Sequence, residues 1–128
     1  MIKIGELKQG DIIRVNDDGV EREGTVVQVS HEEHQALVDN GIQEFWYNQD
    51  QLDAIPVTEA QLVKLGFEKQ VSGTAAKYMR GPFRIVIENG DFGHIEMWYR
   101  EDRRHFNTPL FVHQLQNLYH DMTKVHLE

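Results

Sequence analysis

Hydrophobic positions in the first half of the chain occur in short runs that are separated by turn-forming residues. The runs cover residues 12–15, 25–29, 36–38 and 42–47. Gly, Asn and Asp occupy several of the segments between them, and residues 48–52 are suited to one turn of 3-10 helix before a last short strand near Ile55. Short strands without a long helix predict a small closed β-barrel of the SH3-like kind over residues 1–56.

The second half combines helical and strand patterns. Thr58 and Gln61 have the spacing of a capping box, and Gly66 stands where a helix ends. Alternating apolar and polar positions then indicate strands. The pattern predicts helices at about 59–65 and 109–123 that enclose strands at about 67–71, 75–79, 83–88 and 94–99. Residues 57–128 are therefore predicted to form an α+β unit with a four-stranded antiparallel meander.

Apolar side chains recur along the last predicted helix with the spacing of one helical face. This stripe consists of Phe111, Leu115, Leu118 and Met122, and Val112 and Tyr119 widen it. Thr108 is expected to cap the helix, with Pro109 at its first position. His113 and His120 fall outside the stripe. They are expected to form a solvated helix face, with a surface binding strip or a general-base pair as the alternatives.

Two sequence blocks lie at the joint between the halves and in the last helix. The first is Ile55-Pro56-Val57-Thr58 with Leu62, Gly66 and Phe67 behind it, and the second is Val112-His113-Gln114-Leu115-Gln116-Asn117-Leu118-Tyr119. The chain resembles, through these blocks, a family of short uncharacterised bacterial and phage proteins. The family tail continues with a Thr-Gly pair, whereas Thr123 here precedes Lys124. The resemblance implies the two-part architecture and supplies no activity.

Length and composition restrict the classes of protein. A chain of 128 residues is one domain or two very small ones, so we expect the two halves to pack on each other. The absence of cysteine excludes disulfides, thiolate nucleophiles and Cys-based zinc sites. No secretory signal and no run of about 18 apolar residues is visible, so a cytoplasmic location without membrane contact is expected.

The net charge of −8 belongs to the first half. Residues 1–57 hold 4 Lys/Arg and 12 Asp/Glu, which gives −8, and residues 58–128 hold 9 of each, which gives zero. Nucleic-acid affinity depends on cations that neutralise phosphates. The acidic first half therefore argues against nucleic acid as its partner.

Aromatic residues form two adjacent pairs, Trp46-Tyr47 and Trp98-Tyr99. Neighbours in a strand point to opposite faces of the sheet, so one member of each pair is expected in the core. The other member must be covered by the other half of the chain or by a partner. Because exposed aromatic residues are frequent interface anchors, Trp46, Tyr47 and Trp98 are candidate binding residues.

Several arginine residues lie near Trp98 in the sequence and form the cationic region of the chain. The cluster comprises Arg100, Arg103 and Arg104, with Arg80 and Arg84 upstream. One interpretation is a patch for phosphate or for an acidic protein surface, on which Trp98 can stack a base. The alternative is a charged loop that Glu101 and Asp102 neutralise, since surface ion pairs are common and weak.

His31-Glu32-Glu33-His34 is the densest cluster of potential metal ligands. Helical zinc motifs place two His four residues apart with a Glu between them, whereas this spacing is three and lies in a predicted hairpin loop. His31 and His34 are therefore weak metal-site candidates, and a solvated acidic loop tip is the alternative.

The chain contains no phosphate-binding loop, dinucleotide fingerprint, serine nucleophile elbow or kinase motif set. The leading hypothesis is a non-enzymatic binding or adaptor protein without cofactor, whose partner is another protein or a second copy. The alternative is a nucleic-acid-binding accessory protein that uses Arg84, Arg100, Arg103 and Arg104. A third hypothesis, a small hydrolase or metal-dependent enzyme, lacks a recognised residue set.

Overall fold

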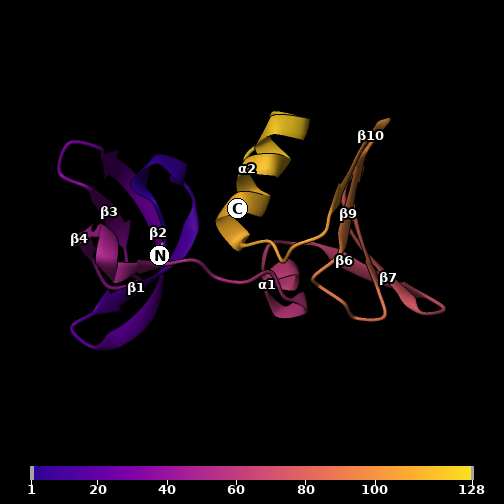
Figure 1. Ribbon diagram of the computed structural model, residues 1–128, viewed down its shortest axis with the longest axis horizontal. Helices are drawn as coiled ribbons and strands as arrows, with labels where there is room; N and C mark the ends of the chain where they lie inside the picture. Colours follow the sequence, from indigo (N-terminus) through magenta and orange to yellow (C-terminus); the bar gives the residue numbers. More distant parts are fainter. Residues whose placement is uncertain (1, 128) are drawn as a thin grey trace. The chain divides into compact units, whose positions relative to one another are not determined.

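The computed structural model describes residues 2–127, and the chain divides into two compact units, Met1–Ile55 and Pro56–Glu128. Both units are built on an antiparallel sheet (Figure 1). Unit 1 contains η1 (Ile4–Glu6), β1 (Ile12–Asp17), β2 (Val20–Ser30), β3 (Gln35–Asp39), β4 (Glu44–Asn48), η2 (Gln49–Gln51) and β5 (Leu52–Asp53). Its strands are ordered β4-β3-β2-β1-β5. The expected 3-10 turn before the last strand is confirmed as η2.

The sheet of unit 1 is open, and the expected closed barrel is wrong at this point. Strand β5 has two residues and pairs only with β1, through Arg14↔Asp53 and Val15↔Leu52. No ladder joins β4 to β5 within the described chain. The sheet stays open because β5 is short. The residues between β4 and β5 form η2 and therefore lengthen neither strand.

The core of unit 1 lies on one face of this sheet. Ile13 and Val15 of β1 are fully buried, together with Val38 of β3 and Leu52 of β5. The N-terminal segment completes this core, since η1 is held by a hydrogen bond from the Ile4 amide to the Gln49 side chain (2.9 Å). The sequence pattern did not predict η1.

Strand β2 approaches β3 closely at Gly24. A Cβ at this position would lie 2.5 Å from Val38 Cγ1 and 2.9 Å from the backbone oxygen of Asp39. Immediately after it, the β2–β3 register shifts between Val26 and Gln28, which marks a bulge. Glycine is therefore required here by the proximity of two backbones.

Unit 2 consists of two helices and a five-stranded meander. Its elements are α1 (Glu59–Lys64), β6 (Glu68–Ser72), β7 (Ala75–Arg80), β8 (Phe83–Glu88), β9 (Ile95–Tyr99), β10 (Asp102–Phe106) and α2 (Val112–Thr123). The strand order is β10-β9-β8-β7-β6. Strand β10 corrects the predicted loop and four-stranded meander. The charged residues of β10 indicated a loop, because the strand lies at the edge of the sheet and three of its five residues are exposed.

The predicted start of α1 is confirmed. Thr58 adopts an extended conformation and its hydroxyl accepts a hydrogen bond from the Gln61 amide (3.3 Å). Gly66 follows with φ of 86°, the left-handed conformation that ends a helix. These signals are local, which is why the sequence located this helix within a residue.

The predicted start of α2 is wrong by three residues. Phe111 is the N-cap, and its amide donates to the Gln114 side chain (3.0 Å). The segment before the helix stays extended because the Val57 amide donates to the Leu110 carbonyl (3.0 Å) and Pro56 forms an isolated bridge with Phe111. A long-range pairing therefore overrides the expected start at Pro109.

Both helices of unit 2 lie on the same face of the sheet (Figure 1). Tyr119 of α2 packs on Phe83 with ring centroids 4.8 Å apart, and Phe67 contacts both rings. His113 is only 1% exposed, so its expected place on a solvated helix face is wrong. The buried face of α2 is wider than the expected stripe, because it extends from Met122 and Leu115 past Tyr119 and Val112 to Gln116 and His113. The opposite face of the sheet carries no helix.

Candidate functional site

The first candidate surface is formed by exposed apolar side chains at strand β4 of unit 1. Ile42 is 71% exposed, Phe45 43% and Trp46 45%, and we call these three residues the β4 edge patch. Tyr47 is buried, so the alternation predicted for the Trp46-Tyr47 pair is confirmed. Phe45 shares the Tyr47 face, with ring centroids 6.3 Å apart, while Trp46 points to the other face. The patch therefore presents apolar groups on both sides of one strand.

The β3–β4 turn that carries Ile42 is fixed by a buried asparagine. The side chain of Asn40 accepts hydrogen bonds from the amides of Ile42 and Gln43 (both 3.0 Å) and donates to the Tyr47 hydroxyl (2.9 Å). Gly41 supports the turn with φ of 92°. The edge patch is thus preorganised, since its most exposed member projects from a turn that the core holds in place.

Strand β4 is also an unpaired edge. It forms a ladder with β3 alone within the described chain, so its second edge has no strand partner there. Two acidic residues lie at the start of β4, where Glu44 pairs in register with Asp39 of β3. An edge strand with exposed apolar side chains is a template for another strand. This arrangement can bind an extended segment.

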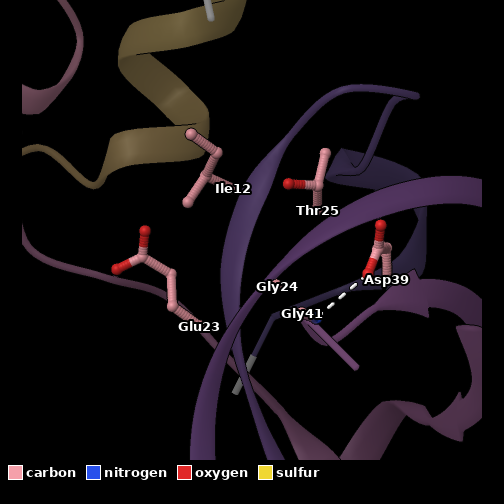
Figure 2. Close-up of a pocket in the computed structure, with 6 residues that line it drawn as sticks. All are labelled: Ile12, Glu23, Gly24, Thr25, Asp39 and Gly41. Atoms are coloured by element: carbon pink, nitrogen blue, oxygen red, sulfur yellow. Dashed lines mark hydrogen bonds between the residues drawn. The ribbon is translucent and has the colours of Figure 1, made fainter. Parts of the chain in front are cut away.

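Figure 2 shows a hollow of about 210 Å³ in unit 1, lined by Ile12, Glu23, Gly24, Thr25, Asp39 and Gly41. Asp39 accepts a hydrogen bond from the Gly41 amide (2.9 Å). The carboxylates of Glu23 and Asp39 lie on opposite sides of the hollow and do not converge (Figure 2). The hollow therefore does not bring its two carboxylates together (Figure 2).

The second candidate surface is the face of the unit 2 sheet opposite the helices. Arg84 on β8, Trp98 on β9 and Arg103 on β10 are direct register partners and form one row across three strands. The Arg103 guanidinium carbon lies 4.4 Å from the centre of the Trp98 ring. The Trp98 Nε1–H donates to Glu96 (3.3 Å), which lies on the same face. We call this surface the Trp98 face.

The structure divides the predicted arginine cluster between two faces. Arg104 pairs in register with buried Met97, so it points to the helix side, where it forms an ion pair with Asp102 (3.1 Å). Arg80 also points to that side and donates to the Leu65 carbonyl (2.8 Å) at the end of α1. The candidates for the Trp98 face are therefore Arg84, Arg100 and Arg103.

A hollow of about 280 Å³ lies beside Trp98 and is lined by Pro82, Arg84, Trp98 and Arg100. Pro82 belongs to the β7–β8 turn and Arg100 to the β9–β10 turn. Both turns occur at the same end of the sheet, because Phe83 pairs with Tyr99. Arg84 and Arg100 form no ion pair with any residue that the structure describes. The Arg100 guanidinium carbon lies 5.2 Å from the centre of the Tyr99 ring, so its contact there is with an aromatic ring and not with a carboxylate.

A third hollow, of about 270 Å³, contains the interacting side chains of Glu59, Lys69 and Tyr78. Glu59 forms an ion pair with Lys69 and accepts a hydrogen bond from the Tyr78 hydroxyl (3.0 Å). The hydrogen bond from Lys69 lowers the pKa of Glu59, and the same contact raises the pKa of Lys69. Burial raises the pKa of Tyr78. The ion pair joins α1 to β6 and the hydrogen bond joins α1 to β7, so we assign the cluster to anchoring α1 on the sheet.

The predicted metal candidates His31 and His34 lie in the β2–β3 turn and are exposed. Within residues 2–127, no group of three or more His, Cys, Asp or Glu side chains is placed to hold a metal ion. A separate exposed pair joins His94 Nδ1 to Asp91 (2.8 Å), and this contact lowers the pKa of Asp91. The histidines therefore provide no assembled metal centre among the described residues.

Comparisons of the chain with models of protein families, with curated proteins and with solved structures find no match. Neither α1 nor α2 has the length and hydrophobicity that crossing a lipid bilayer requires. The two surfaces described above therefore carry the functional interpretation by their geometry alone.

Sequence reasoning identified both tryptophans but missed the residues that frame them. Phe45 was detectable, because it shares the strand period of Tyr47. Asn40 precedes Gly41, which is typical of a turn, while its hydrogen bond to Tyr47 depends on the folded hairpin. The place of Pro82 beside Trp98 depends on strand register, for which the sequence carried no separate signal.

Proposed function

We propose that the protein is a non-enzymatic binding protein and that unit 1 is an open variant of the SH3-like fold. The strand order β4-β3-β2-β1-β5, with a 3-10 helix between β4 and β5, supports that fold assignment. The observation that carries the function is the β4 edge patch on an unpaired strand. Large apolar side chains concentrated on one rigid hairpin are typical of a protein-docking surface.

The proposed occupant is an extended, basic segment of another protein that adds a strand to the free edge of β4. Strand addition uses backbone hydrogen bonds, and side chains of the incoming strand alternate between the two faces of the sheet. Trp46 offers an apolar contact on one face and Phe45 on the other. Glu44 and Asp39 at the start of the strand favour lysine or arginine in the segment.

Charge favours a different protein over a second copy of this chain. Residues 1–57 carry a net charge of −8, so two copies that meet through unit 1 repel each other. The same negative charge attracts a basic partner, which is expected to associate faster at low salt. Self-association through β4 is consequently the weaker form of this proposal.

Site-specific photocrosslinking tests the proposal. A photoreactive amino acid at Gln43, next to the edge patch, should capture a protein in the native cell, and the captured segment can be mapped and purified. Binding of that segment should weaken about tenfold or more for Trp46→Ser and for Ile42→Ser. It should also weaken with increasing salt.

The matched control is Val71→Ser on β6, the edge strand of the other unit, where Val71 is also well exposed. This change should alter the affinity less than about twofold. Equal effects of Val71→Ser and Trp46→Ser contradict docking at β4. Sedimentation of a dimer that Trp46→Ser dissociates overturns the choice of partner in favour of a second copy.

A further inference from the structure

We propose that the hollow lined by Pro82, Arg84, Trp98 and Arg100 binds a nucleoside phosphate. Its base stacks on the free face of Trp98, and its phosphate lies between the guanidinium groups of Arg84 and Arg100. This site belongs to unit 2 and uses none of the residues of the β4 edge patch. It is thus independent of the protein docking proposed above.

The indole ring of Trp98 is held in place by two neighbouring side chains and lines the hollow. Arg103 on β10 covers one face of Trp98 at 4.4 Å, and the indole N–H is held by Glu96 on the same strand. Since β8 is on the other side of β9, the second face of the ring is directed toward Arg84 and the hollow. Stacking of a base on an aromatic ring contributes about 1–3 kcal/mol, and a ring that is already held loses little entropy.

The charge of the hollow fits a phosphate dianion. Arg84 and Arg100 contribute two positive charges that no described residue neutralises by an ion pair. Two carboxylates lie close to these residues along the chain. Glu96 is engaged by Trp98 and lies 3.9 Å from Arg103, and Glu101 follows Arg100 in the exposed turn. One guanidinium group can donate to two phosphate oxygens at once. Two guanidinium groups together balance the two negative charges of the phosphate dianion.

The frame of the hollow is rigid. Pro82 has a ring-restricted backbone and follows Gly81, whose φ is 58°. Arg100 itself adopts φ of 57°, a conformation that is uncommon for arginine. The turn thus holds the Arg100 backbone at the lip of the hollow, and register with Phe83 keeps the two turns adjacent. Volumes near 280 Å³ fall at the small end of ligand sites, which suits a single nucleotide unit.

Fluorescence titration of Trp98 tests the site directly. The chain has two tryptophans, so Trp46→Phe leaves Trp98 as the only indole. Adenosine monophosphate should quench this fluorescence in a saturable way. Adenosine alone and inorganic phosphate should each bind about tenfold more weakly, because each makes only half of the contacts.

Charge variants identify the contacts. Arg84→Gln and Arg100→Gln in the Trp46→Phe protein should each weaken binding of adenosine monophosphate by about tenfold. The matched control is Arg104→Gln, which removes a charge from the same hairpin on the opposite face and should change affinity less than about twofold. Trp98→Leu, followed by calorimetry, should weaken the nucleotide but leave inorganic phosphate nearly unchanged.

A ten-nucleotide oligodeoxyadenylate distinguishes the source of the ligand. Binding of the oligonucleotide about tenfold or more tighter per site than the mononucleotide assigns the hollow to single-stranded nucleic acid, and similar affinities assign it to a free nucleotide. The proposal is overturned if neither probe binds at about 1 mM, if inorganic phosphate binds as well as adenosine monophosphate, or if Arg104→Gln weakens binding as much as Arg84→Gln. Failure here leaves the β4 result unaffected, because Arg84, Trp98 and Arg100 lie in unit 2 and the β4 experiments use a protein that keeps Trp46.

Discussion

Replacing Gly24 with alanine perturbs the close approach of β2 to β3. The added methyl group would lie 2.5 Å from Val38 Cγ1 and 2.9 Å from the Asp39 carbonyl oxygen, whereas ordinary carbon contacts are about 3.5–4.0 Å. Val38 is fully buried, so its side chain has no free space to enter. The carbonyl oxygen belongs to the backbone and moves only with its strand. The two strands must therefore separate locally.

The expected loss follows from two opposing effects. Overpacking of this kind costs about 1–3 kcal/mol, while replacement of glycine by alanine recovers about 0.4–1 kcal/mol from the unfolded chain. Because one of the two close contacts is to backbone, we expect a net loss of about 1–2 kcal/mol in the free energy of unfolding. A unit of this size has a total stability of only about 3–5 kcal/mol, so the loss is easily measured.

Urea unfolding followed by tryptophan fluorescence measures this loss. In a Trp98→Phe background, Trp46 reports unit 1 alone, and with a slope of about 1 kcal/mol per molar urea the midpoint should fall by about 1–2 M. Gly5→Ala is the matched control, since its Cβ would meet nothing within 4 Å. A Gly24→Ala loss no larger than that of Gly5→Ala refutes the reasoning.

Three further predictions concern the turn, the core and the ion pair. Asn40→Ala should lower the free energy of unfolding of unit 1 by about 1–3 kcal/mol, because it removes the partner of the buried Tyr47 hydroxyl; the same urea assay measures it, and no change would contradict the anchoring role. Leu115→Ala, at a fully buried site of α2, should cost about 2–5 kcal/mol by chemical denaturation, and a loss below about 1 kcal/mol would show that the helix packs differently. Lys69→Met should raise the pKa of Glu59 toward its ordinary value, measured by carboxyl NMR titration, since the contact with Lys69 is the main cause of the lowered pKa. The stabilisation from Glu59 is present above the ordinary carboxyl pKa and is lost as the pH falls through the lowered value, so the acid-side loss should weaken in this variant.

The sequence predicted the elements that local signals determine. Thr58 marks the start of α1 and Gly66 its end, and the structure keeps both residues in those roles. The prediction for the start of α2 was wrong because Phe111 is held in an extended conformation by Pro56, which lies far away in the chain. Local capping preferences at Thr108 contain no information about that bridge.

The candidate surfaces were predictable in part for the same reason. The alternation of Trp46 and Tyr47 follows from strand period alone, and it places the exposed indole correctly. The separation of Arg84 from Arg104 depends on β10, whose existence the charged sequence concealed. Once Arg103 pairs with Trp98, the face of every arginine on these strands is fixed by register.

The bridge between Pro56 and Phe111 sets an order of events during translation. Unit 1 has all its strands when residue 53 has left the ribosome, but unit 2 cannot secure its first segment until residue 111 follows, nor fill its core before residue 123. At about 5–20 residues per second, the 70 residues from 53 to 123 take roughly 4–14 seconds to synthesise. All strands of the unit 1 sheet are therefore available for pairing while the remainder of the chain is still being made.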